Sequence, residues 1–157
     1  MADLLVHLAA AAPAKLGLRD GRLRAILWVG VCLPDLLFKT LLYGFGAPTW
    51  FCEPSHSPLG LLPWCYAGAL LFEEAWRARA FAALLGGAYL HLLVDLGKDY
   101  LGSGVLLWAF PFTMSRAELG WYVPEDTVYG MPAAAVLICL VEAVARRISG
   151  SKGKSGS

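Results

Sequence analysis

The sequence has few charged residues for its length. Only 16% of its 157 residues are Asp, Glu, Lys or Arg, whereas 58% are hydrophobic. A water-soluble domain of this size needs more polar surface, so a soluble globule is excluded and the lipid bilayer is the expected solvent. The formal net charge is only +1, and the basic residues form no stripe along one face. Nucleic acid is therefore not an expected partner.

The sequence also lacks the common motifs of soluble enzymes. It has no P-loop, no GxGxxG, no nucleophile elbow and no Ser-His-Asp order, so nucleotide use and serine hydrolysis have no motif behind them. Its cysteines, at positions 32, 52, 65 and 139, form no CxxC pair, and we interpret them as small core residues rather than as metal ligands. The N-terminus lacks the basic region of a signal peptide, and we expect it to be retained.

Long apolar stretches dominate what is present. Four of them can cross a hydrocarbon core about 30 Å thick, and they cover residues 23–45, 58–72, 78–97 and 128–145. A shorter stretch at 3–16 predicts a partial helix packed into the bundle, and 103–114, which contains Pro111, predicts a re-entrant or interfacial segment. The expected fold is all-α, a polytopic transmembrane helical bundle forming one domain over 1–148. The polar residues 149–157 have the composition of a flexible tail or a cloning scar.

Basic residues cluster at the ends of these stretches. The clusters precede the first full span, join the second to the third and follow the fourth: Lys15, Arg19, Arg22 and Arg24; Arg77 and Arg79; Arg146 and Arg147. Because Lys and Arg beside membrane spans are retained in the cytoplasm, four spans with all three clusters inside are predicted. The C-terminus is then cytoplasmic, and residues 46–57 and 98–127 face the other side of a bacterial inner membrane.

Ionisable residues inside these spans are candidates for function. Burying such a side chain in a membrane is costly unless it is paired or solvated, so few are retained without a role. Asp35 follows Pro34 within the first span, and the proline can kink the helix around a polar pocket. His91 and Asp95 are four residues apart and therefore project from the same helical face. This spacing can present one nitrogen and one oxygen ligand to the same cation.

Two further histidines complete the set. His56 precedes the second span, where we expect Ser57 to be the N-cap and Pro58 the first helical residue. The unpaired backbone amides of such a helix start favour an anionic ligand, so Ser57 is a candidate for substrate binding. His7 lies in the N-terminal apolar stretch and reaches the other candidates if that stretch enters from the non-cytoplasmic side.

Each candidate also has a purely structural interpretation. A lone histidine in an apolar helix is usually a hydrogen-bonded core residue, and a His-Asp pair four residues apart can be an intrahelical pair. Lys39 and Lys98 are candidates for binding substrate charge. Lys39 can instead pair with Asp35, four residues before it, and Lys98 can form an interfacial pair with Asp99.

The coincidence of these residues favours a metal site. The chain has only three histidines, and none lies in a predicted cytoplasmic loop. We predict one divalent-metal site whose ligands are His7, Asp35, His56, His91 and Asp95. A mixed imidazole and carboxylate shell favours Zn, with Mn or Fe as alternatives. Whichever of Asp35 and Asp95 is not a ligand is expected to be the general base of the catalytic pair.

At these residues the chain resembles the YdjM-like family of bacterial inner-membrane proteins, described as membrane-bound metal-dependent hydrolases. The resemblance covers most of residues 3–145. It rests on His7, Leu33-Pro34-Asp35, Ser55-His56-Ser57, His91 to Asp95, Gly102-Ser103-Gly104 and the apolar run that ends at Pro111-Phe112. Leu37 stands where many members have a second aspartate, and Phe51 and Cys52 stand where many have a His-Arg pair. The resemblance therefore implies a hydrolase with a reduced ligand set.

These observations predict hydrolysis of a lipid or amphiphilic (phospho)ester at the non-cytoplasmic face, with a membrane lipid as the substrate. Two alternatives remain open. Intramembrane Asp and His residues also form proton and metal-ion pathways, and a homo-oligomer would then supply the second half of a transporter. The metal can also act only as a structural clamp between short helices.

Overall fold

The computed structural model of the protein describes residues 2–18, 20–99 and 106–151. These residues form helices joined by turns and irregular segments, and no β-strand occurs among them. The prediction of an all-α fold is therefore confirmed. The glycine-rich stretch at 102–104, the first residues of the 103–114 segment and residues 152–157 of the predicted tail lie outside the described residues.

Three helices are long and apolar enough to cross a membrane. They are α2 (Gly21–Lys39), extended by the π-helical turn η2 (Thr40–Gly44), α5 (Glu74–Leu96) and α6 (Thr127–Ser151). Each contains a long apolar window with few charged residues, which is the composition that a bilayer requires. Residues 149–151 belong to α6 and not to a tail. The protein thus has the helices of a membrane protein.

The fourth predicted span is not confirmed. In the stretch 58–72 only α4 (Leu61–Ala69) is helical, and nine residues rise only about 14 Å. The stretch is apolar throughout, but the backbone is extended at Ser57 and a turn occupies 58–60 before the helix starts. A second turn at 70–72 ends it. Apolar composition alone therefore overestimated the helical length.

Short helices and an irregular segment complete the chain. The N-terminal stretch forms α1 (Ala2–Ala11) and the 3-10 helix η1 (Ala12–Gly17), so it is the short helix that its length predicted. Between α2 and α4 lie α3 (Thr49–Cys52) and the 3-10 turn η3 (Glu53–His56). Residues 106–123 contain no helix, and η4 (Pro124–Asp126) leads into α6.

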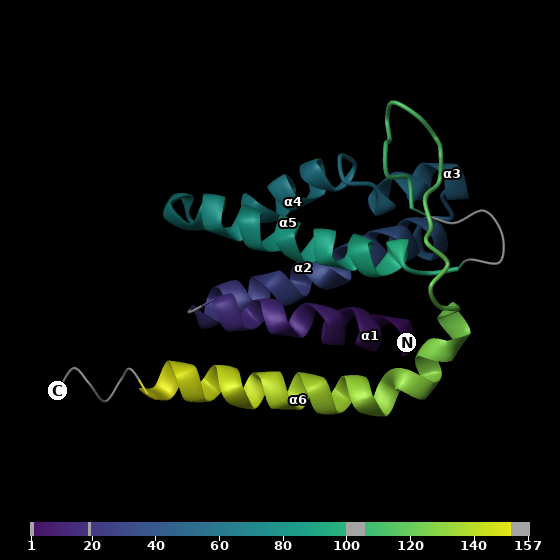
Figure 1. Ribbon diagram of the computed structural model, residues 1–157. Helices are drawn as coiled ribbons and strands as arrows, with labels where there is room; N and C mark the ends of the chain where they lie inside the picture. Colours follow the sequence, from purple (N-terminus) through teal and green to yellow (C-terminus); the bar gives the residue numbers. More distant parts are fainter. Residues whose placement is uncertain (1, 19, 100–105, 152–157) are drawn as a thin grey trace.

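The helices run alongside one another, so that the bundle has two ends (Figure 1). At one end, here called the Leu96 end, lie the C-terminus of α5 and the N-termini of α1 and α6. At the other, the Glu74 end, lie the N-termini of α2 and α5 and the C-terminus of α6 (Figure 1). The most extensive packing is between α2 and α5, while α6 packs mainly on α1 and η1.

A glycine crossing holds α2 and α5 together. A Cβ atom added at Gly30 would lie 2.2 Å from the backbone oxygen of Leu84, and one added at Gly87 would lie 2.2 Å from that of Leu27. The two backbones are therefore in direct contact, as small residues permit between membrane helices. Because of this crossing, α2 and α5 face each other along the part of each helix that continues toward the Leu96 end.

The cysteines are only partly core residues. All four are free thiols; Cys52 and Cys65 are buried, and Cys32 is half-buried. Cys139 is exposed on α6, so its assignment to the core was wrong. The reason is that only 17% of the apolar window of α6 is buried among the described residues, and in a bilayer such a surface faces lipid.

Candidate metal centre

All five predicted ligands meet near the Leu96 end of the bundle. His7 comes from α1, Asp35 from α2, His56 from η3, and His91 and Asp95 from α5. They form two groups that share His91, and within each group the ligand atoms lie within 4.8 Å of one another: His7, His91 and Asp95; Asp35, His56 and His91. Residues up to 88 positions apart in the chain are thereby joined.

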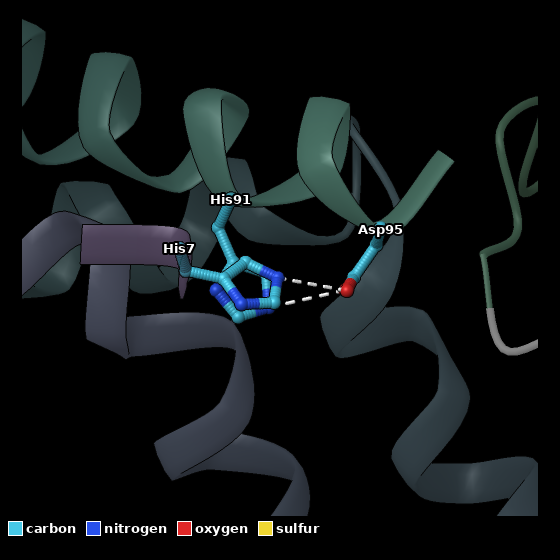
Figure 2. A group of neighbouring side chains, drawn as sticks. All are labelled: His7, His91 and Asp95. Carbon is cyan, nitrogen blue, oxygen red and sulfur yellow. Dashed lines mark hydrogen bonds and ion pairs between the residues drawn. The ribbon is translucent and has the colours of Figure 1, made fainter. Parts of the chain in front are cut away.

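Asp95 is the centre of the first group. Its carboxylate is buried, with Oδ1 2.9 Å from His7 Nε2 and Oδ2 3.1 Å from His91 Nε2. Figure 2 shows both imidazole rings side by side and directed at this carboxylate. The rings of His7 and His91 are stacked with centroids 4.0 Å apart. One carboxylate therefore faces two imidazole nitrogens in a space from which solvent is excluded.

His91 is held in an orientation typical of a metal ligand. Its Nδ1 lies 2.8 Å from the backbone oxygen of Val31, and only a protonated Nδ1 can donate to a carbonyl. In the neutral ring Nε2 then carries a lone pair. This buried Nε2 has no hydrogen-bond partner among the described residues, although it faces Asp95. Two electron-rich atoms at that distance require a cation or a proton between them.

His56 joins the two groups. Its Nε2 lies 3.7 Å from Asp35 Oδ1 and 3.7 Å from Asp95 Oδ2. On the other side of the ring, Nδ1 lies 3.1 Å from the hydroxyl of Ser55. Ser55 can therefore fix the ring orientation, as residues behind a metal-ligating histidine do.

Both lysines pair with the candidate carboxylates. Lys39, which is exposed, donates to Asp35 Oδ2, so the local pair that the sequence offered as an alternative is present. Lys98 is buried, donates to Asp95 Oδ1, and has its Nζ 3.4 Å from His7 Nε2. Lys98 thus lies inside the cluster of candidate ligands. Its ammonium compensates part of the carboxylate charge.

Ser57 has a structural role. The prediction that it is the N-cap of a helix starting at Pro58 was wrong, because α4 begins at Leu61 and its N-cap is Gly60. The Ser57 hydroxyl donates to the Pro54 oxygen at 2.8 Å and accepts from the Gly60 amide at 2.9 Å. It is also completely buried. Its hydrogen bonds stabilise the turn that places His56.

The residues fit a divalent ion of the imidazole and carboxylate class. Ligands about 2.1 Å from one ion are at most about 4.2 Å apart, so small side-chain adjustments bring either group of 4.8 Å spread to coordination distance. The buried Nε2 of His91 already points at a ligand oxygen without a hydrogen bond among the described residues. The described residues therefore offer ligand groups that could hold a metal ion.

Sequence reasoning missed three contributors to the site. Ser55 was signalled only by its position beside His56. The Val31 carbonyl had no signal in the sequence, because every residue carries a backbone carbonyl and only the fold shows which one His91 Nδ1 meets. The third is the segment 106–123, which covers this end: its Leu107 amide donates to the His56 oxygen at 3.2 Å.

A groove opens beside His56. It has a volume of about 440 Å³ and an apolar lining that includes Leu41, Trp50, Phe51, Trp64, Phe110 and Ser55. Ser55 belongs both to this lining and to the hydrogen bond with His56. The groove therefore runs up to the residues behind the candidate metal ligands.

No family model, curated protein or solved structure matches the chain. The resemblance to the YdjM-like family rests on its motifs and stays a prediction.

Proposed function

We propose that this protein is a membrane-embedded metal-dependent hydrolase that acts on a lipid or an amphiphilic (phospho)ester. The observation that carries the proposal is the buried His91 Nε2, which is oriented by the Val31 carbonyl and faces Asp95 without a hydrogen bond among the described residues. Such a nitrogen is a ready ligand. With His7 and Asp95 it offers two nitrogens and an oxygen to one ion.

The ligand chemistry favours Zn, with Mn or Fe as alternatives. A divalent ion in this shell supplies Lewis-acid chemistry, because it acidifies water and polarises an ester or phosphoryl oxygen. His7, His91 and Asp95 would hold it, and Ser55 would fix the orientation of His56 beside it.

The two carboxylates differ in a way that assigns their roles. The side chain of Asp95 is 2% exposed and that of Asp35 is 18% exposed. A general base must exchange protons with water and reach the substrate. Asp35 therefore fits the base, and Asp95 fits the ligand. Lys39, which is exposed and bonded to Asp35, is placed to meet the charge of a substrate phosphate.

The substrate class follows from the groove beside His56. Its aromatic and aliphatic lining suits an acyl chain or another apolar group, while the Asp35 and Lys39 pair offers charge nearby. The positive-inside pattern puts this end on the non-cytoplasmic side. We therefore propose a multi-pass protein of a bacterial inner membrane, with a cytoplasmic C-terminus and a lipid-like substrate.

A structural metal clamp is the second candidate. The ligands come from α1, α2, η3 and α5, so one ion would tie together four elements, two of which are short. Asp95 also has the Lys98 ammonium as a partner, which is compatible with a site that binds and does not turn over. The hydrolase and the structural clamp would bind the same metal, but only the hydrolase would turn over a substrate.

The test separates binding from turnover. The wild-type protein and the Asp35→Asn variant are purified in mild detergent, loaded with Zn or Mn, and assayed on phospholipids and small phosphoesters. We expect Asp35→Asn to keep its metal and to lose turnover by about 10²- to 10⁴-fold, the usual contribution of a general base. Metal binding without turnover on any substrate would favour the clamp. Ion flux in proteoliposomes would favour translocation.

A further inference from the structure

A cavity lined by charged side chains lies toward the Glu74 end of the bundle. It has a volume of about 690 Å³, and its lining includes Lys15, Arg24, Trp28, Glu142 and Arg146. These residues come from η1, the start of α2 and the C-terminal half of α6. Arg24 precedes Asp35 by eleven residues of one helix, or about 16 Å. The cavity is therefore separate from the candidate metal centre and from the function proposed for it.

The cavity has an excess of positive charge. Three cationic side chains line it against one carboxylate, that of Glu142. Lys15 is 7% exposed and Arg24 is 8% exposed, so two of the cations are nearly removed from solvent. Lys15 Nζ donates to Glu142 at 2.7 Å, but Arg24 donates to the neutral carbonyls of Leu18 and Ala145. The single carboxylate can balance only one of the three cations, so the lining carries two unbalanced positive charges.

Trp28 contributes an aromatic ring to this lining. Its indole Nε1 is buried and has no hydrogen-bond partner among the described residues. Its ring lies 4.5 Å from Lys15 Nζ. The ring therefore packs on the Lys15 ammonium and helps to hold that cation in the cavity wall.

We propose that this cavity binds a phosphate group, carried by the headgroup of an anionic membrane phospholipid. Arginine and lysine are the side chains that bind phosphate oxygens, and basic pockets between transmembrane helices on the cytoplasmic side bind anionic headgroups. The basic clusters of the sequence predict that the Glu74 end is cytoplasmic, which puts this cavity beside the anionic leaflet.

Arg146 is the residue best suited to test the proposal. Its side chain is 79% exposed, and its Nε lies 3.5 Å from Glu142 Oε1, which is long for an ion pair. Removing it should not disturb the part-buried contact between Lys15 and Glu142. Its neighbour Arg147 is also exposed and does not line the cavity, so Arg147→Ala is a control with the same change of charge.

The experiment measures bound lipid. Protein in detergent is incubated with phosphatidylglycerol or phosphatidylcholine, and the bound lipid is counted by native mass spectrometry. We expect phosphatidylglycerol to bind in preference, with affinity about fivefold lower in Arg146→Ala and unchanged in Arg147→Ala, since one basic residue contributes roughly that factor.

Three results would overturn the proposal. They are equal binding of the two lipids, an equal loss in Arg146→Ala and Arg147→Ala, and displacement of phosphatidylglycerol by an equal concentration of inorganic phosphate, which would make the ligand a free anion. The metal content of Arg146→Ala is measured on the same samples and should equal that of the wild type. Loss of the lipid preference therefore does not bear on the hydrolase proposal.

Discussion

The two ends of α5 handle ionisable groups differently. Near its start, the exposed guanidinium groups of Arg22 and Arg79 contact the ring of Trp76, with their carbons 5.4 and 5.9 Å from the ring centroid. Near its end, Asp95 is buried against two imidazoles and an ammonium. The guanidinium groups are satisfied by aromatic faces and by water. The buried charge of Asp95 is instead balanced by the neighbouring imidazoles and ammonium or by an ion, so it depends on these groups.

This comparison predicts that single changes at the Leu96 end have large effects on metal binding and that changes at the Glu74 end have almost none. The largest effect is expected for Asp95→Asn. Asparagine keeps the shape but removes the charge that Lys98 and a metal share, and loss of a buried ionic partner typically costs about 3–5 kcal/mol. We expect metal occupancy to fall below detection and thermal stability in detergent to drop.

Asp99→Asn is the matched control for that change. It removes a carboxylate four residues further along, outside both candidate ligand groups. Its metal content and melting temperature should match those of the wild type. Similar losses in both variants would show that the charge of this segment matters, and not the position of Asp95.

A backbone contact should matter almost as much as a ligand. Gly87→Ala places a Cβ 2.2 Å from the Leu27 oxygen, whereas Gly86→Ala places one 3.8 Å from a Leu27 methyl group, an ordinary contact. The first change must separate α2 from α5 and should cost about 1–3 kcal/mol or more. We expect it to reduce metal binding strongly, because α2 carries Asp35 and the carbonyl that orients His91.

Gly86→Ala should leave both metal binding and stability unchanged. Titration of each variant with Zn, followed by elemental analysis and thermal unfolding, measures the two effects. Normal metal binding in Gly87→Ala would show that the site does not depend on the helix crossing.

A smaller effect on metal affinity is expected for a change at Ser55, which lies behind His56. Ser55→Ala removes the hydroxyl that lies 3.1 Å from His56 Nδ1 and leaves every ligand in place. Loss of such an orienting partner typically lowers metal affinity by 10- to 100-fold. Because His56 is 3.7 Å from the nearest carboxylate oxygens and so is the most loosely held of the three histidines, we expect about tenfold in a competitive Zn titration. An unchanged affinity would exclude an orienting role for Ser55.

The smallest effect on the metal is expected at the other end. Glu142→Gln removes the partly exposed carboxylate that accepts from Lys15 and helps to attach α6 to η1. The cost should be about 1 kcal/mol or less, which is a shift of about 2–4 °C in melting temperature for a chain of this size. Metal content should not change. A loss of metal in this variant would mean that changes at the Glu74 end affect metal binding at the Leu96 end.

Local features of the site could be predicted from the sequence. His91 and Asp95 share a helical face because four residues make about one turn, and the structure shows them together. The convergence of His7, Asp35 and His56 on that pair was a hypothesis based on the scarcity of histidine, and the structure agrees with it. His7, Asp35, His91 and Asp95 were informative because they are polar side chains in apolar stretches, where the bilayer removes the other reasons for their presence.

Features that depend on contacts between distant segments could not be predicted. Lys98 follows the last turn of α5, and nothing in the sequence indicates that the chain there turns its side chain inward to Asp95. The crossing of Gly30 and Gly87 requires knowledge of which helices are neighbours. The stretch 58–72 is apolar enough for a span, yet turns at both ends leave a helix of nine residues.

Metal binding by the cluster around Asp95 underlies both functions considered for this protein. The most direct test is to purify the protein in mild detergent without chelator or metal-affinity resin and to measure bound metals by elemental mass spectrometry, with His91→Ala and Glu74→Ala beside it. We expect a near-stoichiometric transition metal in the wild type and in Glu74→Ala, and its loss in His91→Ala. Absence of metal from the wild type, even after reconstitution with Zn or Mn, would contradict this expectation.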